Sequence, residues 1–295
     1  MRRPTTVELM LLSTIGLWSL NLTVSRYILT HGFEPLAYST ARYGLAALVF
    51  LCLTLALERS LRLSRRDLGI AAAAAAVLFV NQIGFVYALD RSGASILGVL
   101  LGATPVFAGL VGLALRLESL PRRFWVGATV SFAGVALVAL GSGGELSGDL
   151  GGVLFGDVTA ASWAVYSILV TPLMRRYSAT RISTVVLGFA MLPITLVGLP
   201  QLDRQAWDLP AEVWLLFVFA TLGPLVLTNE LWFRTLDRIG PARATLAANL
   251  QPFVAAAVAV VLLSETLALL ELAGGVLIAL GIFSARRRRV APQAQ

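Results

Sequence analysis

Apolar residues run in long blocks along this chain, and short polar stretches separate the blocks. A helix that spans a bilayer requires about 20 mostly apolar residues, and each block reaches or approaches that length. We therefore predict an all-α membrane protein with ten transmembrane helices. The ten predicted spans are 8–29, 35–57, 68–89, 94–116, 124–141, 150–172, 182–200, 211–233, 241–263 and 268–285.

Composition excludes several classes of protein. Of the 295 residues, 58% are hydrophobic and 13% are charged, whereas soluble domains carry about 25% charged residues. The mean hydropathy is +0.83. A soluble enzyme, a disordered chain and a secreted disulfide scaffold are therefore improbable. The single cysteine, Cys52, and the single histidine, His31, leave no ligand cluster, so we expect neither a metal nor a cofactor.

All 23 basic residues are arginine, and the net charge is +7. Their position in short loops is typical of the positive-inside rule, so we expect no nucleic-acid partner. Nineteen arginines fall in the tails and in alternate loops, against three, Arg26, Arg91 and Arg204, in the intervening loops. This asymmetry predicts that both termini are cytoplasmic. We expect the protein to lie in a bacterial cytoplasmic (inner) membrane.

The sequence also contains an internal repeat. An offset of 147 residues aligns positions in the two halves, and an offset of 145 aligns the first part. We predict one integral membrane domain built of two five-helix repeats, residues 1–145 and 146–295. Because five is odd, the second repeat enters the membrane in the opposite orientation, a recurrent transporter design. The matched pairs include Trp18 with Trp163, Asp90-Arg91 with Asp237-Arg238, Pro105 with Pro252, Glu118 with Glu265, Gly127 with Gly274, and Gly134 with Gly281.

Three motifs resemble a known family. They are GLWSLN at 16–21, SWAVYSILVTPLMRR at 162–176, and a Glu-x(8)-Gly-x(6)-Gly pattern that begins at Glu118 and again at Glu265. Together they resemble the EamA-type family of the drug/metabolite transporter superfamily. The resemblance implies a ten-helix secondary carrier, and many carriers of this family export amino acids or other small metabolites.

Polar side chains inside the predicted spans are candidates for a substrate site, because such groups usually face the interior of a helix bundle. An alternative is that the tryptophans fill the core and the amides join helices. The candidate substrate-binding residues are Trp18, Asn21, Tyr38, Arg42, Asn81, Gln82, Trp163, Tyr166 and Asn249.

Two prolines, Pro105 and Pro252, fall near the middle of the fourth and ninth spans. Each leaves the carbonyl four residues earlier, that of Leu101 or Ala248, without its helical partner. We predict a helix kink at each proline. The kink either serves packing alone or turns a free carbonyl toward a cavity.

Three charged residues are predicted inside the membrane. Arg42 and Asp157 lie at similar depths in the second and sixth spans, so they form an ion pair, or else Arg42 binds a substrate carboxylate beside Tyr38. Asp157 and Glu230 are candidates for ion or proton coupling. Glu230 alternatively pairs with Arg234 one helical turn later.

These features favour a secondary transporter that works by alternating access and exports amino acids or related small metabolites. An uptake permease, a membrane enzyme that acts on lipid-linked substrates and a non-transporting scaffold are the alternatives. No catalytic motif supports the enzyme. The expected partners are a small-molecule substrate and the bilayer, and we expect a monomer, with a dimer as the alternative.

Overall fold

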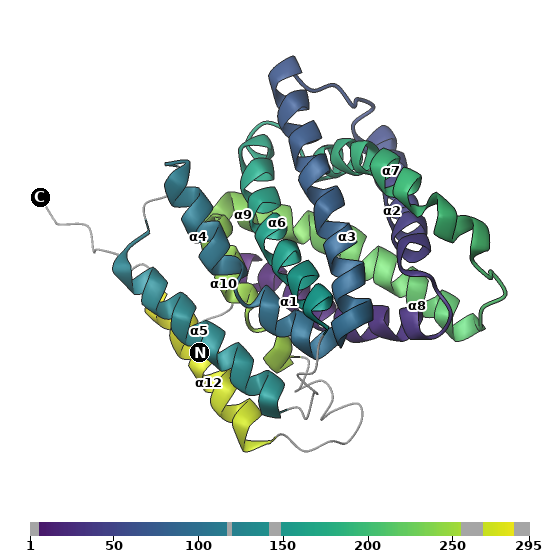
Figure 1. Ribbon diagram of the computed structural model, residues 1–295. Helices are drawn as coiled ribbons and strands as arrows, with labels where there is room; N and C mark the ends of the chain where they lie inside the picture. Colours follow the sequence, from purple (N-terminus) through teal and green to yellow (C-terminus); the bar gives the residue numbers. More distant parts are fainter. Residues whose placement is uncertain (1–5, 117–119, 142–148, 255–267, 286–295) are drawn as a thin grey trace, which may run out of the picture.

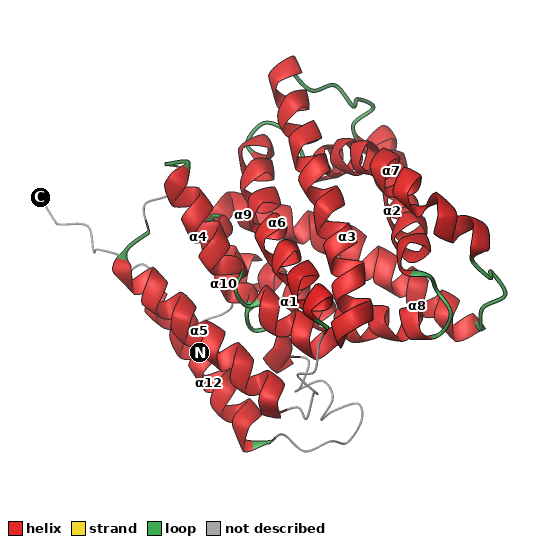
Figure 2. Cartoon of the chain, viewed as in Figure 1, coloured by secondary structure: helices red, strands yellow, loops and turns green. Residues whose placement is uncertain are grey.

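The computed structural model describes residues 6–116, 120–141, 149–254 and 268–285, and within them it contains helices and no strand (Figures 1 and 2). The helices are α1 (Thr6–Thr30), α2 (Pro35–Leu57), α3 (Arg65–Leu101), α4 (Thr104–Ala114), α5 (Arg122–Gly141), α6 (Leu150–Met174), α7 (Ala179–Arg204), α8 (Ala211–Thr221), the π-helix η1 (Leu222–Leu227), α9 (Thr228–Ile239), α10 (Pro241–Ala248) and α12 (Leu269–Ala285).

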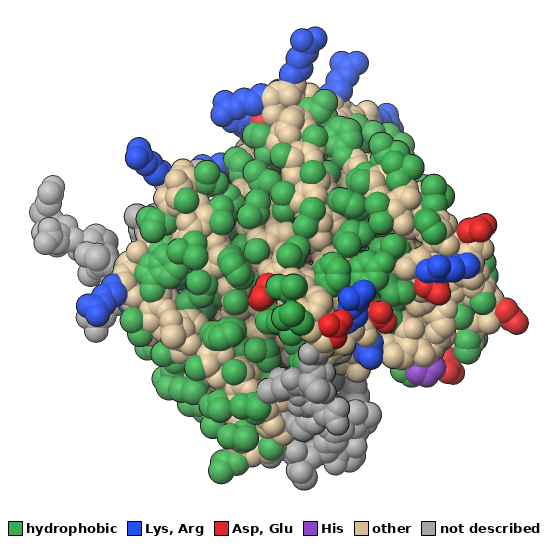
Figure 3. Space-filling model, in the orientation of Figure 1, with side chains coloured by type: hydrophobic (Ala, Val, Ile, Leu, Met, Phe, Trp, Pro, Cys, Tyr) green, Lys and Arg blue, Asp and Glu red, His purple; other side chains and the backbone are tan. Residues whose placement is uncertain are grey.

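The surface of the bundle is apolar, as the sequence predicts. Leu57, Leu215 and Phe283 are each more than 70% exposed. Figure 3 shows hydrophobic side chains across the middle of one face and basic side chains projecting at the upper edge. In the described residues, eight helical segments are long and apolar enough to cross a bilayer. The protein is therefore an all-helical, multi-pass membrane protein.

The third, fourth and ninth predicted spans differ from the described helices. We predicted a loop at 90–93, but α3 continues without interruption from Arg65 to Leu101. The polar residues there include no proline, so nothing removes a backbone donor from the helix. The ninth predicted span extends into residues 255–263, and Glu118 and Glu265 also lie outside the described residues. The last described helix, α12, has 17 residues.

Local capping explains several helix starts. Ser64 accepts a hydrogen bond from the backbone N–H of Asp67 at 3.1 Å, at the start of α3. Ser178 does the same for Arg181 at 3.1 Å, at the start of α7. Side-chain oxygens at these positions satisfy backbone N–H groups that have no partner inside the helix.

Helices from the two halves of the chain pack in pairs. Helix α2 packs on α7, α3 on α6, α4 on α10 and α5 on α12. In the last pair, a Cβ added to Gly134 would lie 2.6 Å from the carbonyl oxygen of Gly274, and a Cβ added to Gly274 would lie 2.6 Å from that of Gly134. Gly127 and Gly281 contact each other in the same reciprocal way. These backbones touch directly, which is possible only between residues without a side chain.

Three interruptions occur where prolines lie inside predicted spans. Helix α3 ends at Leu101, and α4 begins at Thr104 with Pro105 in its first turn. Helix α10 ends at Ala248, four residues before Pro252. The hydroxyl of Thr104 donates to the carbonyl of Leu101 at 2.6 Å, so the carbonyl that Pro105 leaves free has a partner.

The third interruption is the π-helix η1, which contains Pro224. An α-helix would bond the carbonyl of Ala220 to the N–H of residue 224, and proline has no N–H. The carbonyl of Ala220 is therefore available to a side chain from another helix. π-Helical segments of this kind often lie at functional sites.

Candidate functional site

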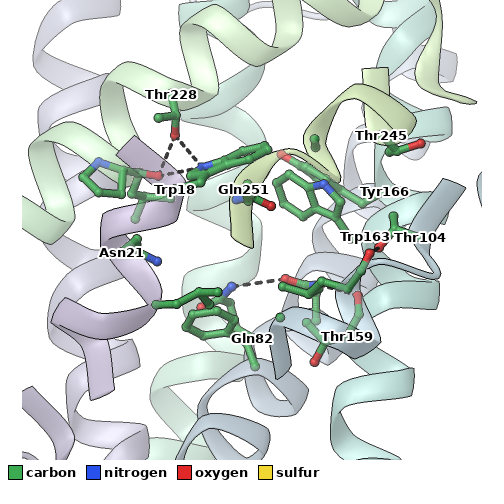
Figure 4. Close-up of a pocket in the computed structure, with 18 of the residues that line it drawn as sticks. Trp18, Asn21, Gln82, Thr104, Thr159, Trp163, Tyr166, Thr228, Thr245 and Gln251 are labelled. Atoms are coloured by element: carbon green, nitrogen blue, oxygen red, sulfur yellow. Dashed lines mark hydrogen bonds between the residues drawn. The ribbon is translucent and has the colours of Figure 1, made fainter. Parts of the chain in front are cut away.

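A cavity lies where the helix interruptions meet (Figure 4). Its walls come from α1 to α7, η1, α9 and the segment around the end of α10. Eight of the nine candidate substrate-binding residues border it: Trp18, Asn21, Arg42, Asn81, Gln82, Trp163, Tyr166 and Asn249. Tyr38 is the exception.

Aromatic rings form one wall of the cavity. The ring centroids of Trp18 and Trp163 lie 5.4 Å apart in an edge-to-face arrangement, and Trp163 lies 5.3 Å from Tyr166. The indole N–H of Trp18 donates to the carbonyl of Pro224 at 3.1 Å and to the hydroxyl of Thr228 at 2.9 Å. Figure 4 shows Trp18, Trp163 and Tyr166 on the same side of the pocket. The rings are therefore held as a fixed apolar surface.

The sequence analysis missed two residues that position these rings. Trp232 is fully buried, and its ring centroid lies 4.9 Å from that of Trp18 and 6.2 Å from that of Trp163. Pro224 supplies the carbonyl that holds Trp18. A tryptophan and a proline within the eighth predicted span were the available signals.

Amide side chains of the cavity also join helices, in agreement with the alternative that we considered. Asn81 on α3 donates to the carbonyl of Thr159 at 2.9 Å and to the hydroxyl of Ser162 at 3.2 Å, both on α6. Gln82 donates to the side-chain oxygen of Asn81 at 3.2 Å. These amides therefore fix the α3–α6 contact and still present polar atoms to the cavity.

Arg42 is the charged residue of the cavity. It is 4% exposed, and no acidic side chain borders the cavity within the described ranges. Its Nε and Nη2 atoms donate to the carbonyl of Ala220 at 3.2 and 2.9 Å, and Nη2 donates to Oδ1 of Asn21 at 3.0 Å. The carbonyl of Ala220, which Pro224 leaves without its helical partner, therefore accepts hydrogen bonds from the guanidinium group.

The alternative ion pair between Arg42 and Asp157 is not formed: neither residue has an ion pair in the described part of the chain. Asp157 is partly exposed on α6 and does not border the cavity. Equal depth along two helices does not ensure contact, because the rotation of each helix decides which side chains face each other.

Tyr38 supports Arg42 from outside the cavity. The Tyr38 ring lies 5.7 Å from the guanidinium carbon of Arg42. The Tyr38 hydroxyl is 2.8 Å from that of Ser25, and the side chain is fully buried among Phe33 and Phe217. Tyr38 therefore contacts Arg42 but does not border the cavity.

Glu230 does not border the cavity but lies in a separate crevice between the ends of α2 and α6, the start of α7 and one side of α9. Its Oε1 accepts a hydrogen bond from Nε of Arg234 at 2.9 Å, and its Oε2 accepts one from Thr180 at 3.2 Å. This is the (i, i+4) pairing that the sequence offered as the alternative to proton coupling.

An apolar-surfaced helix bundle with a polar, aromatic-lined cavity at broken helices is the architecture of a membrane transporter. The sequence profile of the EamA-like transporter family matches residues 5–140 and again residues 150–286. The chain belongs to this family.

Named relatives agree with this class. The chain is 25% identical to the "Probable amino-acid metabolite efflux pump" of Salmonella typhimurium, over 95% of this chain and 96% of that one. It is 24% identical to the "Uncharacterized transporter YdfC" of Bacillus subtilis, a match that spans 64% of this chain and only 61% of the relative. A solved crystal structure, 21% identical in sequence, superimposes with a TM-score of 0.76 and covers 95% of this chain and 96% of its own. That likeness concerns the fold.

Proposed function

We propose that the protein is a secondary transporter that exports amino acids or related small metabolites from the cytoplasm by alternating access. The observation that carries the proposal is the cavity itself. Two sequence-equivalent tryptophans, Trp18 and Trp163, border it, and the helices around it break near Pro105 and Pro252. Substrate sites of such carriers lie between repeats at discontinuous helices.

The proposal includes ten membrane spans in two inverted repeats. Reciprocal contacts support it: Gly127 meets Gly281 and Gly134 meets Gly274, while the sequence offset pairs Gly127 with Gly274 and Gly134 with Gly281. A twofold axis in the membrane plane produces this exchange of partners. Two similar halves of opposite orientation allow one cavity to open to either side in turn.

We further propose that both termini are cytoplasmic, in an inner membrane, since the arginine-rich loops lie on that side. We also propose that the protein transports as a monomer.

Counterflow in liposomes tests transport. Purified protein is reconstituted into vesicles loaded with one unlabelled amino acid, and uptake of a trace of the same labelled amino acid is followed across a panel of twenty. We expect transient accumulation of at least one, absent from protein-free vesicles. Failure across the panel would contradict an amino-acid carrier.

Direction is tested in cells. Overexpression of an exporter lowers the intracellular level of a toxic analogue of the transported amino acid and raises the tolerated dose. Greater sensitivity to that analogue would instead identify an uptake permease. Cells that overexpress Trp163→Ala serve as the control for the effect of overexpressing a membrane protein on growth.

A further inference from the structure

Only some of the N–H donors of the Arg42 guanidinium group have hydrogen-bond acceptors within the described residues. Its Nε and Nη2 atoms bind the carbonyl of Ala220 and the side-chain oxygen of Asn21. Nη1 has no hydrogen-bond partner among the residues that the structure describes, although the side chain is 4% exposed and borders the cavity. Arginine carries five donors in a planar fork that matches a carboxylate.

The charge of Arg42 is also uncompensated. Both of its acceptors are neutral oxygens, and the cavity wall contains no Asp or Glu in the described ranges. Arginine stays protonated in proteins, and a cation inside a membrane protein pairs with an anion or marks a substrate path. Within the described residues, the cavity wall supplies no such anion for Arg42.

The other residues of the cavity wall indicate the chemistry of the uncharged part of a ligand, which we call its body. Among the residues that the structure describes, the wall contains one cation beside Trp18, Trp163, Tyr166 and aliphatic side chains such as Leu78. A single cation matches a single negative charge, and the aromatic wall matches an apolar or aromatic body. A phosphate dianion would be left without a second cation.

We infer that the cavity selects solutes that carry a carboxylate on an apolar or aromatic body, with Arg42 as the anion-binding residue, and that it excludes the corresponding amines. This inference rests on the proposed function, because it names the chemistry of the solute carried. An amino acid satisfies it, with amide oxygens and indole faces available to the ammonium group.

Three probes of the same shape test the inference: 3-phenylpropionate, 3-phenylpropanamide and phenethylamine. Their binding to purified protein in detergent is measured by isothermal titration calorimetry. Because charge-assisted hydrogen bonds are the stronger class, we expect the acid to bind about tenfold or more tightly than the amide. We expect no measurable binding of the amine at the same concentration.

Two variants assign the preference to Arg42. In Arg42→Gln, we expect the affinity for the acid to fall to that for the amide. Asn21→Asp keeps Arg42 and the shape of its partner but places a carboxylate at the position of Oδ1, 3.0 Å from Nη2. The internal carboxylate should neutralise the arginine, so affinity for the acid falls while the melting temperature is equal to or above that of wild type. Asn21→Asp therefore remains informative if Arg42→Gln fails to fold.

Arg204→Gln is the matched control, because it removes a cation that is 61% exposed and does not border the cavity. It should bind the acid as wild type does. Three outcomes would each overturn the inference. The wild-type protein binds acid and amide equally, the wild-type protein does not bind the acid, or Asn21→Asp keeps the full affinity for the acid. Counterflow separates the two proposals. Preferential binding of the acid together with no counterflow of any amino acid in the panel contradicts the proposed function alone, and counterflow of an amino acid without an acid preference in binding contradicts this inference alone.

Discussion

Asn249 donates a hydrogen bond from Nδ2 to the backbone carbonyl of Gly102 at 3.1 Å, and these residues are separated by 147 positions. That separation equals the offset that aligns the two halves of the sequence. The same Nδ2 also donates to the hydroxyl of Ser131 at 3.1 Å. The break between α3 and α4 is therefore bonded directly to the corresponding break after α10. A free carbonyl at membrane depth requires such a partner.

Asn249→Ala should destabilise the protein. The variant leaves the Gly102 carbonyl and the Ser131 hydroxyl without this donor, and loss of a buried hydrogen bond costs about 1–3 kcal/mol. Thermal unfolding in detergent should show a lower melting temperature. Thr129→Ala is the control, because Thr129 is exposed and bonds only within α5. Equal melting temperatures for the two variants would show that this contact does not stabilise the fold.

Gly134→Ala should weaken the contact between α5 and α12. A Cβ at Gly134 would lie 2.6 Å from the carbonyl oxygen of Gly274, so the helices must move apart. Overpacking of this kind costs about 1–3 kcal/mol. Gly188→Ala is the matched control: nothing lies within 4 Å of its added Cβ, and alanine favours a helix by about 0.5–1 kcal/mol. The melting temperatures of the two variants should therefore shift in opposite directions, and equal shifts would contradict the direct backbone contact.

Trp18→Ala and Trp163→Ala should each reduce transport strongly while membrane-inserted protein stays near wild-type levels. Both residues border the cavity, and removal of either ring opens the aromatic wall that the substrate would contact. Counterflow normalised to reconstituted protein is the measurement. Trp207→Ala is the control, because Trp207 is 46% exposed near the end of α7. Normal counterflow by both cavity variants would show that the tryptophans serve packing only.

Cysteine labelling should report the orientation. In a Cys52→Ala background, we expect Asp208→Cys to react with a membrane-impermeant maleimide in intact cells. Arg62→Cys should react only after permeabilisation. Both positions are exposed and follow different helices, α7 and α2. The opposite pattern would reverse the topology derived from the arginine-rich loops.

The sequence alone determined the class of fold. Long apolar blocks fold as helices in a bilayer because each backbone polar group must find a partner within its own segment. The sequence also pointed to eight residues that border the cavity, since residues such as Asn81 and Gln82 are too polar to face lipid. The repeat offset pairs Trp18 with Trp163, and in the structure their rings are in contact.

Only the tertiary structure decided which groups meet. Arg42 binds Asn21 and the carbonyl of Ala220, while Asp157 remains apart from it. Sequence position sets the depth of a residue along its helix, but the packing of neighbouring helices sets the rotation of each helix and therefore the direction of its side chains. The carbonyl of Ala220 is a backbone acceptor, so the residue type at this position does not reveal it. Only Pro224, four residues later, indicates in the sequence that this carbonyl lacks its helical partner.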